Sequence, residues 1–176
     1  MQNYIADPLS IVDIRNFALG IRNVLDFNTN DKKFFPIVEF LELIMPQIVK
    51  GFHICVFDKN QMGNIHGLAC PEDNCINIRE DVYEGAIKDN GRDRFTLAHE
   101  LGHFLMHNKN HVKLARIENG QKCEIYRDPE WQANTFAAEL LMPNNLMDTD
   151  NCFQIANDFG VSLSAAQIRV KKIYKH

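Results

Sequence analysis

The segment that most limits what this chain can fold into is RFTLAHELGHFLMH, residues 94–107. Its apolar residues recur at intervals of three and four, which is the spacing of one face of an α-helix. Polar residues occupy the other side. We therefore predict an amphipathic helix whose polar side faces a cleft. Its core-facing side carries Leu97, Ala98, Leu101, Phe104 and Leu105.

The polar side of this helix contains the motif H-E-x-x-H, formed by His99, Glu100 and His103. Positions i and i+4 of a helix lie about 40° apart around its axis, so both imidazoles can reach one metal ion. Zinc peptidases use this spacing, and the glutamate between the ligands accepts a proton from a metal-bound water. The alternative is a surface helix with a few titratable side chains. We favour the metal site.

A catalytic zinc site usually has three protein ligands, so a third must come from elsewhere in the chain. The extended motif H-E-x-x-H-x-x-G-x-x-H does not continue here, because Met106 and Lys109 occupy its glycine and histidine positions. His107 shares the polar side of the helix but lies a further turn along. We expect it to support a ligand or the structure.

A second helix offers a carboxylate as the third ligand. Asp128 and Pro129 are typical residues for the start of a helix, which continues through EWQANTFAAELLM. Glu130 is the predicted ligand. Glu124 and Asp128 remain alternatives, because the start of a predicted helix is uncertain by a few residues. One turn after Glu130, Asn134 can hydrogen-bond a ligand imidazole, and adjacent alanines allow the two helices to approach closely.

The first half of the chain predicts a scaffold of helices and a small sheet. Apolar residues recur at helical spacing over 10–27 and 36–44, and the next proline ends the second helix. Residues 52–57 and 75–79 have the composition and alternation of strands. The segment 58–74 between them is rich in turn residues, so we predict that the sheet is antiparallel.

Three further features of the sequence lie near the predicted helix 94–107, which we call the metal helix. Segment 75–79 lies just upstream of it, and an exposed strand edge there can pair with an extended peptide. Asp93 is a candidate N-terminal cap of the helix. The polar segment 108–127 predicts a long loop with at most brief regular structure, or a cover over the cleft.

Composition excludes several classes of protein. A net charge of −4 over 176 residues gives no case for broad nucleic-acid binding. No apolar run approaches the ~20 residues of a membrane helix. The N-terminal residues MQNYIADPLS lack the basic and apolar blocks of a signal peptide. We expect a cytoplasmic protein that contacts neither nucleic acid nor membrane directly.

The five cysteines form no C-x-x-C pair, and their number is odd. Such a set is a poor framework for disulfides and a poor structural zinc site. Cys70 and Cys75 flank a turn and can lie near each other across it. We expect reduced thiols in a reducing compartment. A cysteine nucleophile is conceivable, but no cysteine lies in a sequence context that suggests one.

Together, the H-E-x-x-H helix and the segment EWQANTFAAELLMP closely resemble the ImmA/IrrE family of metallopeptidases. The order of helices, a small sheet with an I-x-I strand and then these two motifs also matches, over roughly residues 10–143. The resemblance implies an α+β fold: a mostly helical, zincin-like domain of the gluzincin type, with a small antiparallel sheet beside the metal helix. The implied site residues agree with the choice made above: His99, His103 and Glu130 as metal ligands and Glu100 as general base.

We predict one metallopeptidase domain, residues 1–143, and a helical C-terminal segment, residues 144–176, packed on it. The segment contains a helix, a glycine turn and a second helix, and so resembles a helix-turn-helix. The basic residues that we expect on its surface are Arg169, Lys171 and Lys172. So few basic residues favour packing over DNA binding.

The resemblance also implies a function. Members of this family are typically bacterial or phage regulators that cut a helix-turn-helix repressor of a mobile element or stress response. We expect an endopeptidase with one divalent ion, zinc by default, although manganese or iron can also bind two histidines and a carboxylate. The alternative is a metal-containing module that sequesters a repressor or toxin without cutting it. Such a module has no need for Glu100.

One role is left open by the sequence. A peptidase needs a further donor to the oxygen that becomes negatively charged during attack on the amide. Tyr126, His107 and Tyr83 are candidates. Asn134, His107 and Tyr126 are also the residues we expect around the ligands.

Overall fold

The computed structural model describes residues 5–24, 33–107, 112–113 and 124–174. Its elements, in chain order, are β1 (Ile5–Ala6), α1 (Ile11–Val24), α2 (Ile37–Glu39), the π-helix η2 (Phe40–Ile44), α3 (Met45–Ile48), β2 (His53–Phe57), α4 (Lys59–Met62), β3 (Gly67–Cys70), η3 (Pro71–Asp73), β4 (Cys75–Arg79), α5 (Glu80–Ile87), α6 (Gly91–Met106), β5 (Val112–Lys113), η4 (Ile125–Arg127), α7 (Pro129–Leu141), η5 (Asn144–Leu146), α8 (Cys152–Phe159) and α9 (Leu163–Tyr174).

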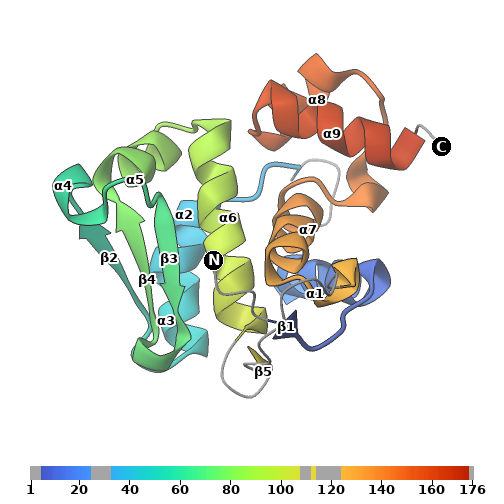
Figure 1. Ribbon diagram of the computed structural model, residues 1–176. Coiled ribbons are helices and arrows are strands. Elements are labelled where there is room, and N and C mark those ends of the chain that lie inside the picture. The colour runs from blue at the N-terminus through green and yellow to red at the C-terminus, as the bar shows by residue number, and fades with distance from the viewer. Residues whose placement is uncertain (1–4, 25–32, 108–111, 114–123, 175–176) are drawn as a thin grey trace.

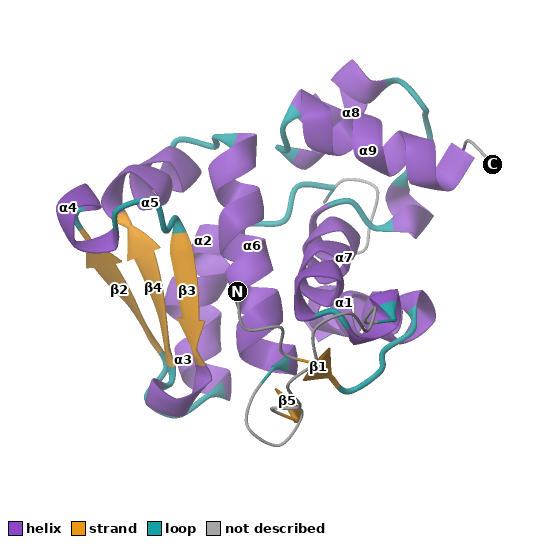
Figure 2. Cartoon of the chain, viewed as in Figure 1, coloured by secondary structure: helices purple, strands orange, loops and turns teal. Residues whose placement is uncertain are grey.

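Helix α6 lies between two parts of the structure (Figure 1). A three-stranded sheet lies on one side of it, and α7 with α1 lies on the other. Helices dominate and the sheet is small (Figure 2), which confirms the predicted α+β class. Within the described residues, no helix is both long and apolar enough to cross a membrane.

The sheet is mixed, so the prediction of an antiparallel sheet is wrong. Its order is β2-β4-β3, in which β2 runs parallel to β4 and only β3 is antiparallel to it. Residues 58–74, predicted as turns, contain the helix α4, the strand β3 and the short 3₁₀ helix η3. Asp58 caps α4 through a capping box, and β3 follows at the far edge of the sheet. The chain then turns back into the centre as β4, which makes β4 parallel to β2.

This topology decides which strand has a free edge. Strand β4, just upstream of the metal helix, is paired on both sides, and Ile76 and Ile78 are fully buried. An added peptide therefore cannot pair with it. Strand β3 is an edge strand of this sheet and packs against α6.

Two predicted helix ends also differ from the structure. Asn90, rather than Asp93, caps α6, because its side-chain oxygen accepts two backbone N–H bonds of the first turn. The helix predicted over 36–44 continues past Pro46 through η2 into α3. The wider turn of a π-helix can accommodate a proline ring that an α-helix would exclude.

The core is built around the contact between α6 and α7. The predicted apolar side of α6 is buried, with Leu97, Ala98 and Leu101 fully inside. Gly102 faces α7 so closely that an added Cβ would lie 3.0 Å from the Phe136 ring and 3.3 Å from the Ala133 Cα. Small residues on both helices therefore set the distance between them.

The predicted loop 108–127 falls mostly outside the described residues. Within it, β5 pairs with β1, and η4 leads into α7. Its use as a cover over the cleft stays a prediction.

A buried ion pair attaches the C-terminal segment to α7. Arg169 donates to both carboxylate oxygens of Glu139, at 3.0 and 2.7 Å, and to the Met142 carbonyl oxygen at 3.0 Å. Arg15 of α1 donates to the same carboxylate at 3.3 Å. The predicted exposure of Arg169 is wrong, because this side of α9 faces α7. The domain boundary at residue 143 stays a prediction.

Arg94 makes a second connection from the buried side of α6. Its Nε donates to the Gly160 carbonyl oxygen at 2.8 Å, and its Nη2 donates to the Phe35 carbonyl oxygen at 2.7 Å. The guanidinium also stacks 3.7 Å from the centre of the Phe34 ring. Gly160 ends α8 with φ of 60°, a conformation that favours glycine. Helix α6 and the C-terminal helices are thus connected to each other.

We expect Arg169→Met to lower the free energy of unfolding by about 3–5 kcal/mol, because it removes the main partner of a buried carboxylate. Lys171→Met, on an exposed position of the same helix, should change it by less than ~0.5 kcal/mol. Urea unfolding followed by circular dichroism measures both. Equal stability of the two variants would contradict this role of the ion pair.

Candidate metal centre

Helices α6 and α7 bring the three predicted ligands together. The Nε2 atoms of His99 and His103 are 3.0 Å apart, and the carboxylate oxygens of Glu130 lie 3.4 and 3.3 Å from them. In a tetrahedral zinc site with bonds of about 2.0–2.1 Å, neighbouring ligand atoms are roughly 3.3 Å apart. The donor set therefore fits one divalent ion. The Glu130 side chain is 68% exposed, so the cluster is open to solvent on that side.

Burial favours the neutral form of the imidazoles. It lowers the pKa of His103 to about 3, with further lowering by His99 and His107. It also lowers the pKa of His99 and of His107. A neutral imidazole has the free lone pair that a metal requires, so the protonation of the cluster suits metal binding.

Glu100 lies between α6 and the edge strand β3. Its Oε2 accepts a hydrogen bond from the backbone N–H of Ala69 at 3.0 Å. A Cβ on Gly67 would lie 2.6 Å from Glu100 Cγ, so the absence of a side chain at 67 lets the strand approach. Burial raises the pKa of Glu100 to about 7, although the bond from Ala69 lowers it. A carboxyl group with a pKa near neutrality can both accept and return a proton.

Asn134 orients His99. Its Oδ1 lies 3.2 Å from Nδ1 of the imidazole. An amide oxygen can only accept, so the proton of His99 is on Nδ1 and the lone pair is on Nε2, towards Glu130.

A longer hydrogen-bond chain orients His103, and it passes through a residue that the sequence did not single out. Buried Gln132 donates from Nε2 to the carbonyl oxygens of Asp7 and Tyr126, at 2.8 and 2.7 Å. Its Oε1 must therefore accept from His107 Nε2, at 2.8 Å. Neutral His107 then accepts on Nδ1 from His103 Nδ1, at 2.9 Å. The lone pair of His103 is left on Nε2, where His99 and Glu130 converge.

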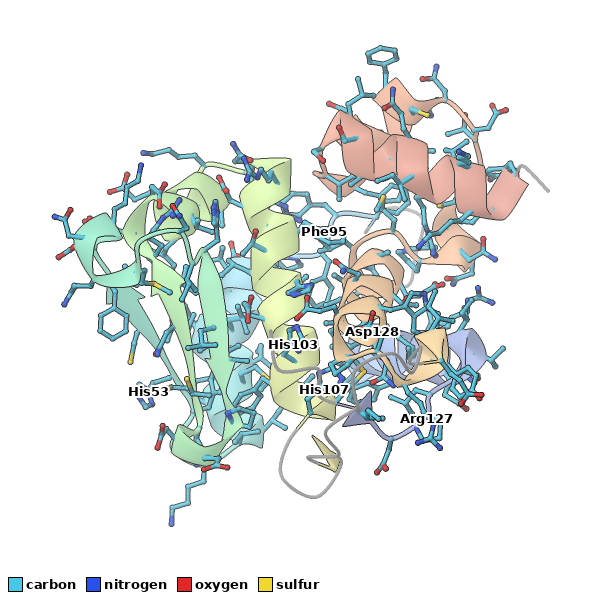
Figure 3. The ribbon with its side chains drawn as sticks, viewed as in Figure 1. His53, Phe95, His103, His107, Arg127 and Asp128 are labelled. Carbon is cyan, nitrogen blue, oxygen red and sulfur yellow. The ribbon has the colours of Figure 1, made fainter. Side chains whose placement is uncertain are left out.

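His103 and His107 lie between α6 and α7 in Figure 3. The expected support from His107 thus has a geometry, but the role of Gln132 had no local signal. Its acceptor Asp7 is 125 residues away in sequence and is brought near only by the fold.

The two alternative third ligands have other partners. Asp128 caps α7, accepting from the Glu130 backbone N–H at 2.9 Å. Glu124 lies 3.5 Å from Arg127. Neither belongs to the group formed by His99, His103 and Glu130 in the described part of the chain.

The tyrosines predicted as donors are engaged elsewhere. The Tyr83 hydroxyl donates to Glu42 of η2. A hydrogen bond with Glu124 raises the pKa of Tyr126, and its backbone carbonyl accepts from Gln132. Of the three candidates, His107 is the one in contact with a proposed ligand.

We expect Gln132→Met to weaken zinc affinity roughly 10–100-fold, because residues that orient a ligand imidazole contribute this much. The substitution keeps the size of the side chain but removes the anchor of His107. Competition with a chromophoric chelator measures the affinity. Thr135→Val, at another buried position of α7, is the control and should bind zinc as the wild type does. Unchanged affinity in a folded Gln132→Met variant would exclude the orienting role.

Comparison with models of known protein families extends these observations. Residues 59–171 match Peptidase M78, the IrrE N-terminal-like domain. The match includes β3, both helices of the cluster and most of α9. No curated protein sequence matches significantly. Because the family model covers more than half of the chain, and because the motifs resemble the same family, the chain belongs to the IrrE N-terminal-like family of metallopeptidases, Peptidase M78.

Proposed function

We propose that this chain is a metal-dependent endopeptidase with a zincin-like arrangement, in which His99, His103 and Glu130 hold one divalent ion, zinc by default. The observation that carries the proposal is the convergence of these three ligands, with spacings of 3.0–3.4 Å, on helices that also hold Glu100. A module that only sequesters a partner would gain nothing from a buried carboxyl group with a pKa near 7.

The chain's own chemistry centres on Glu100. A divalent ion bound at this cluster would lower the pKa of a water molecule and polarise the scissile carbonyl. The Glu100 carboxylate accepts the proton of the attacking water and passes it to the leaving amine. The bond from Ala69 holds this carboxylate in place. Asn134 and the Gln132–His107 pair hold the two imidazoles in the tautomers that leave Nε2 free.

The position of the β3 edge favours a substrate that binds as an extended peptide. The N–H of Ala69 points away from β4 and towards Glu100, so the outer edge of β3 faces the proposed catalytic carboxylate. A peptide that pairs with this edge would have to displace Glu100 from the N–H of Ala69, and it would then lie beside the Glu100 carboxylate. On the other side, Trp131 and Tyr126 line an open, largely apolar groove of about 500 Å³.

The substrate we propose is a helix-turn-helix transcriptional repressor of a mobile element or stress response. The ImmA/IrrE resemblance supports it, and a peptidase of this family acts on a protein. The burial of Arg169 also supports action on a protein, because it leaves α9 with fewer exposed cations for binding DNA.

We expect Glu100→Gln to reduce cleavage roughly 10²–10⁴-fold while metal content stays unchanged. The amide can still accept from Ala69 but cannot take a proton. Mass spectrometry of products from a repressor encoded beside the gene measures the rate, and Glu84→Gln, at an exposed position of α5, is the control. Cleavage at the wild-type rate by Glu100→Gln would remove the general-base assignment.

Glu130→Ala should lose one equivalent of bound metal per chain relative to the wild type, because two histidines alone seldom hold a catalytic ion. Glu124→Ala should keep it. Elemental analysis after metal removal and reconstitution measures both. Full metal content in Glu130→Ala, with loss in Glu124→Ala, would move the third ligand to Glu124.

A further inference from the structure

A second group of metal-binding side chains lies on the sheet, apart from the cluster described above. Parallel pairing places His53 of β2 beside Cys75 of β4, and antiparallel pairing places Cys70 of β3 on the other side of Cys75. Directly paired residues project from the same face of a sheet. Cys55, two residues after His53, projects from that face too. We call this the thiol face; the buried Ile76 projects from the opposite face.

The side chains of the thiol face lie close together. One ligand atom each from His53, Cys55 and Cys75 lies within 4.8 Å of the others. Cys70 and Cys75 are also directly paired across β3 and β4. Asn77 connects this pair, since its Nδ2 donates to Cys70 Sγ and its Oδ1 accepts from Cys75 Sγ, both at 3.6 Å. Two strands, β2 and β4, thus bring three ligand atoms together, and Cys70 of β3 lies beside Cys75 outside this group.

His53 is oriented as a metal ligand. Its Nδ1 lies 3.0 Å from the Gly51 carbonyl oxygen, which can only accept. The proton is therefore on Nδ1 and the lone pair is on Nε2. Ligand histidines in zinc proteins commonly donate their other N–H to a backbone carbonyl in this way. The His53 side chain is exposed, and Figure 3 shows it beside the sheet, well apart from His103 and His107.

We propose that His53, Cys55, Cys70 and Cys75 form a second metal site, which takes one zinc ion in a Cys₃His set. Zinc–sulfur bonds of about 2.3 Å place neighbouring sulfur atoms roughly 3.8 Å apart in a tetrahedron, so His53, Cys55 and Cys75 need only small side-chain movements to bind one ion. Cys70 has to rotate towards them to complete the set. Each thiol loses its proton to solvent on binding. The site does not rest on the proposed peptidase function, since it shares no residue with it.

The alternative to a metal site is a disulfide between two of these thiols. Cys70 and Cys75 are adjacent across the two strands and could instead form a disulfide. A nucleophilic role is disfavoured, because burial raises the pKa of both thiols and reactive cysteines have lowered values. The exposed histidine aligned beside them is needed for a metal site but not for a disulfide.

Occupation of this site would fix the edge strand β3. Cys70 directly follows Ala69, whose N–H donates to Glu100 from the outer edge of the strand. An ion bound to Cys70, Cys75 and β2 would cross-link all three strands at that end of the sheet. The site therefore stabilises the strand on which Glu100 depends.

Cobalt titration of the reduced, metal-free full chain tests the proposal. Cobalt replaces zinc in tetrahedral sites, and sulfur-to-cobalt charge-transfer absorption appears only where thiolates are ligands. We expect this absorption to saturate when one cobalt ion per chain is bound at the thiol face. It should persist in Glu130→Ala, which alters the other cluster, and in Cys152→Ser, which removes a thiol outside the thiol face.

Cys55→Ser and Cys75→Ser should each greatly reduce the absorption. His53→Gln, an exposed change that cannot disturb the core, should weaken cobalt affinity about tenfold or more. Wild-type spectra and affinity in Cys55→Ser and His53→Gln would overturn the proposal, as would absence of charge-transfer absorption in the wild type. A Cys70–Cys75 disulfide that forms in air in the presence of zinc would also overturn it.

Discussion

The close contact between α6 and α7 is the constraint on which the rest of the structure depends. A side chain at Gly102 would crowd Phe136 and Ala133, so the two helices would have to shift to admit it. The same contact decides the chemistry, because two of the proposed ligands are on α6 and the third is on α7. A wider separation would move Glu130 away from the imidazoles and open a cavity beside Phe136. Core packing and site geometry are therefore one property of this pair of helices.

Buried polar groups around this contact are satisfied by partners from distant parts of the chain. Gln132 reaches Asp7, Arg94 reaches Gly160, and Arg169 reaches Glu139. An unmade hydrogen bond in such surroundings costs about 1–3 kcal/mol, so each group strongly favours one arrangement of the elements that it joins. The orientation of His103 follows from such a group. Its tautomer is set by where the amide of Gln132 must donate.

Local periodicity was enough to predict the central helix and the start of α7 from sequence. The helical repeat places His99 and His103 together, and Asp128 with Pro129 marks the helix that carries Glu130. Strand order was not local, and the parallel pairing of β2 with β4 depended on an edge strand hidden among turn residues. Burial of Arg169 depended on a carboxylate 30 residues away. Cys55 and Cys75 fit no sequence motif, because β2 and β4 must pair before their thiols meet.

Zinc-edge anomalous diffraction from crystals of the zinc-loaded protein tests the central claim most directly. The account predicts a peak about 2.0–2.2 Å from Nε2 of His99, Nε2 of His103 and a carboxylate oxygen of Glu130. Glu100 should be near the peak but not bonded to it. A protein that binds zinc but gives no peak between these three side chains, or a peak that Glu130 does not contact, would contradict it.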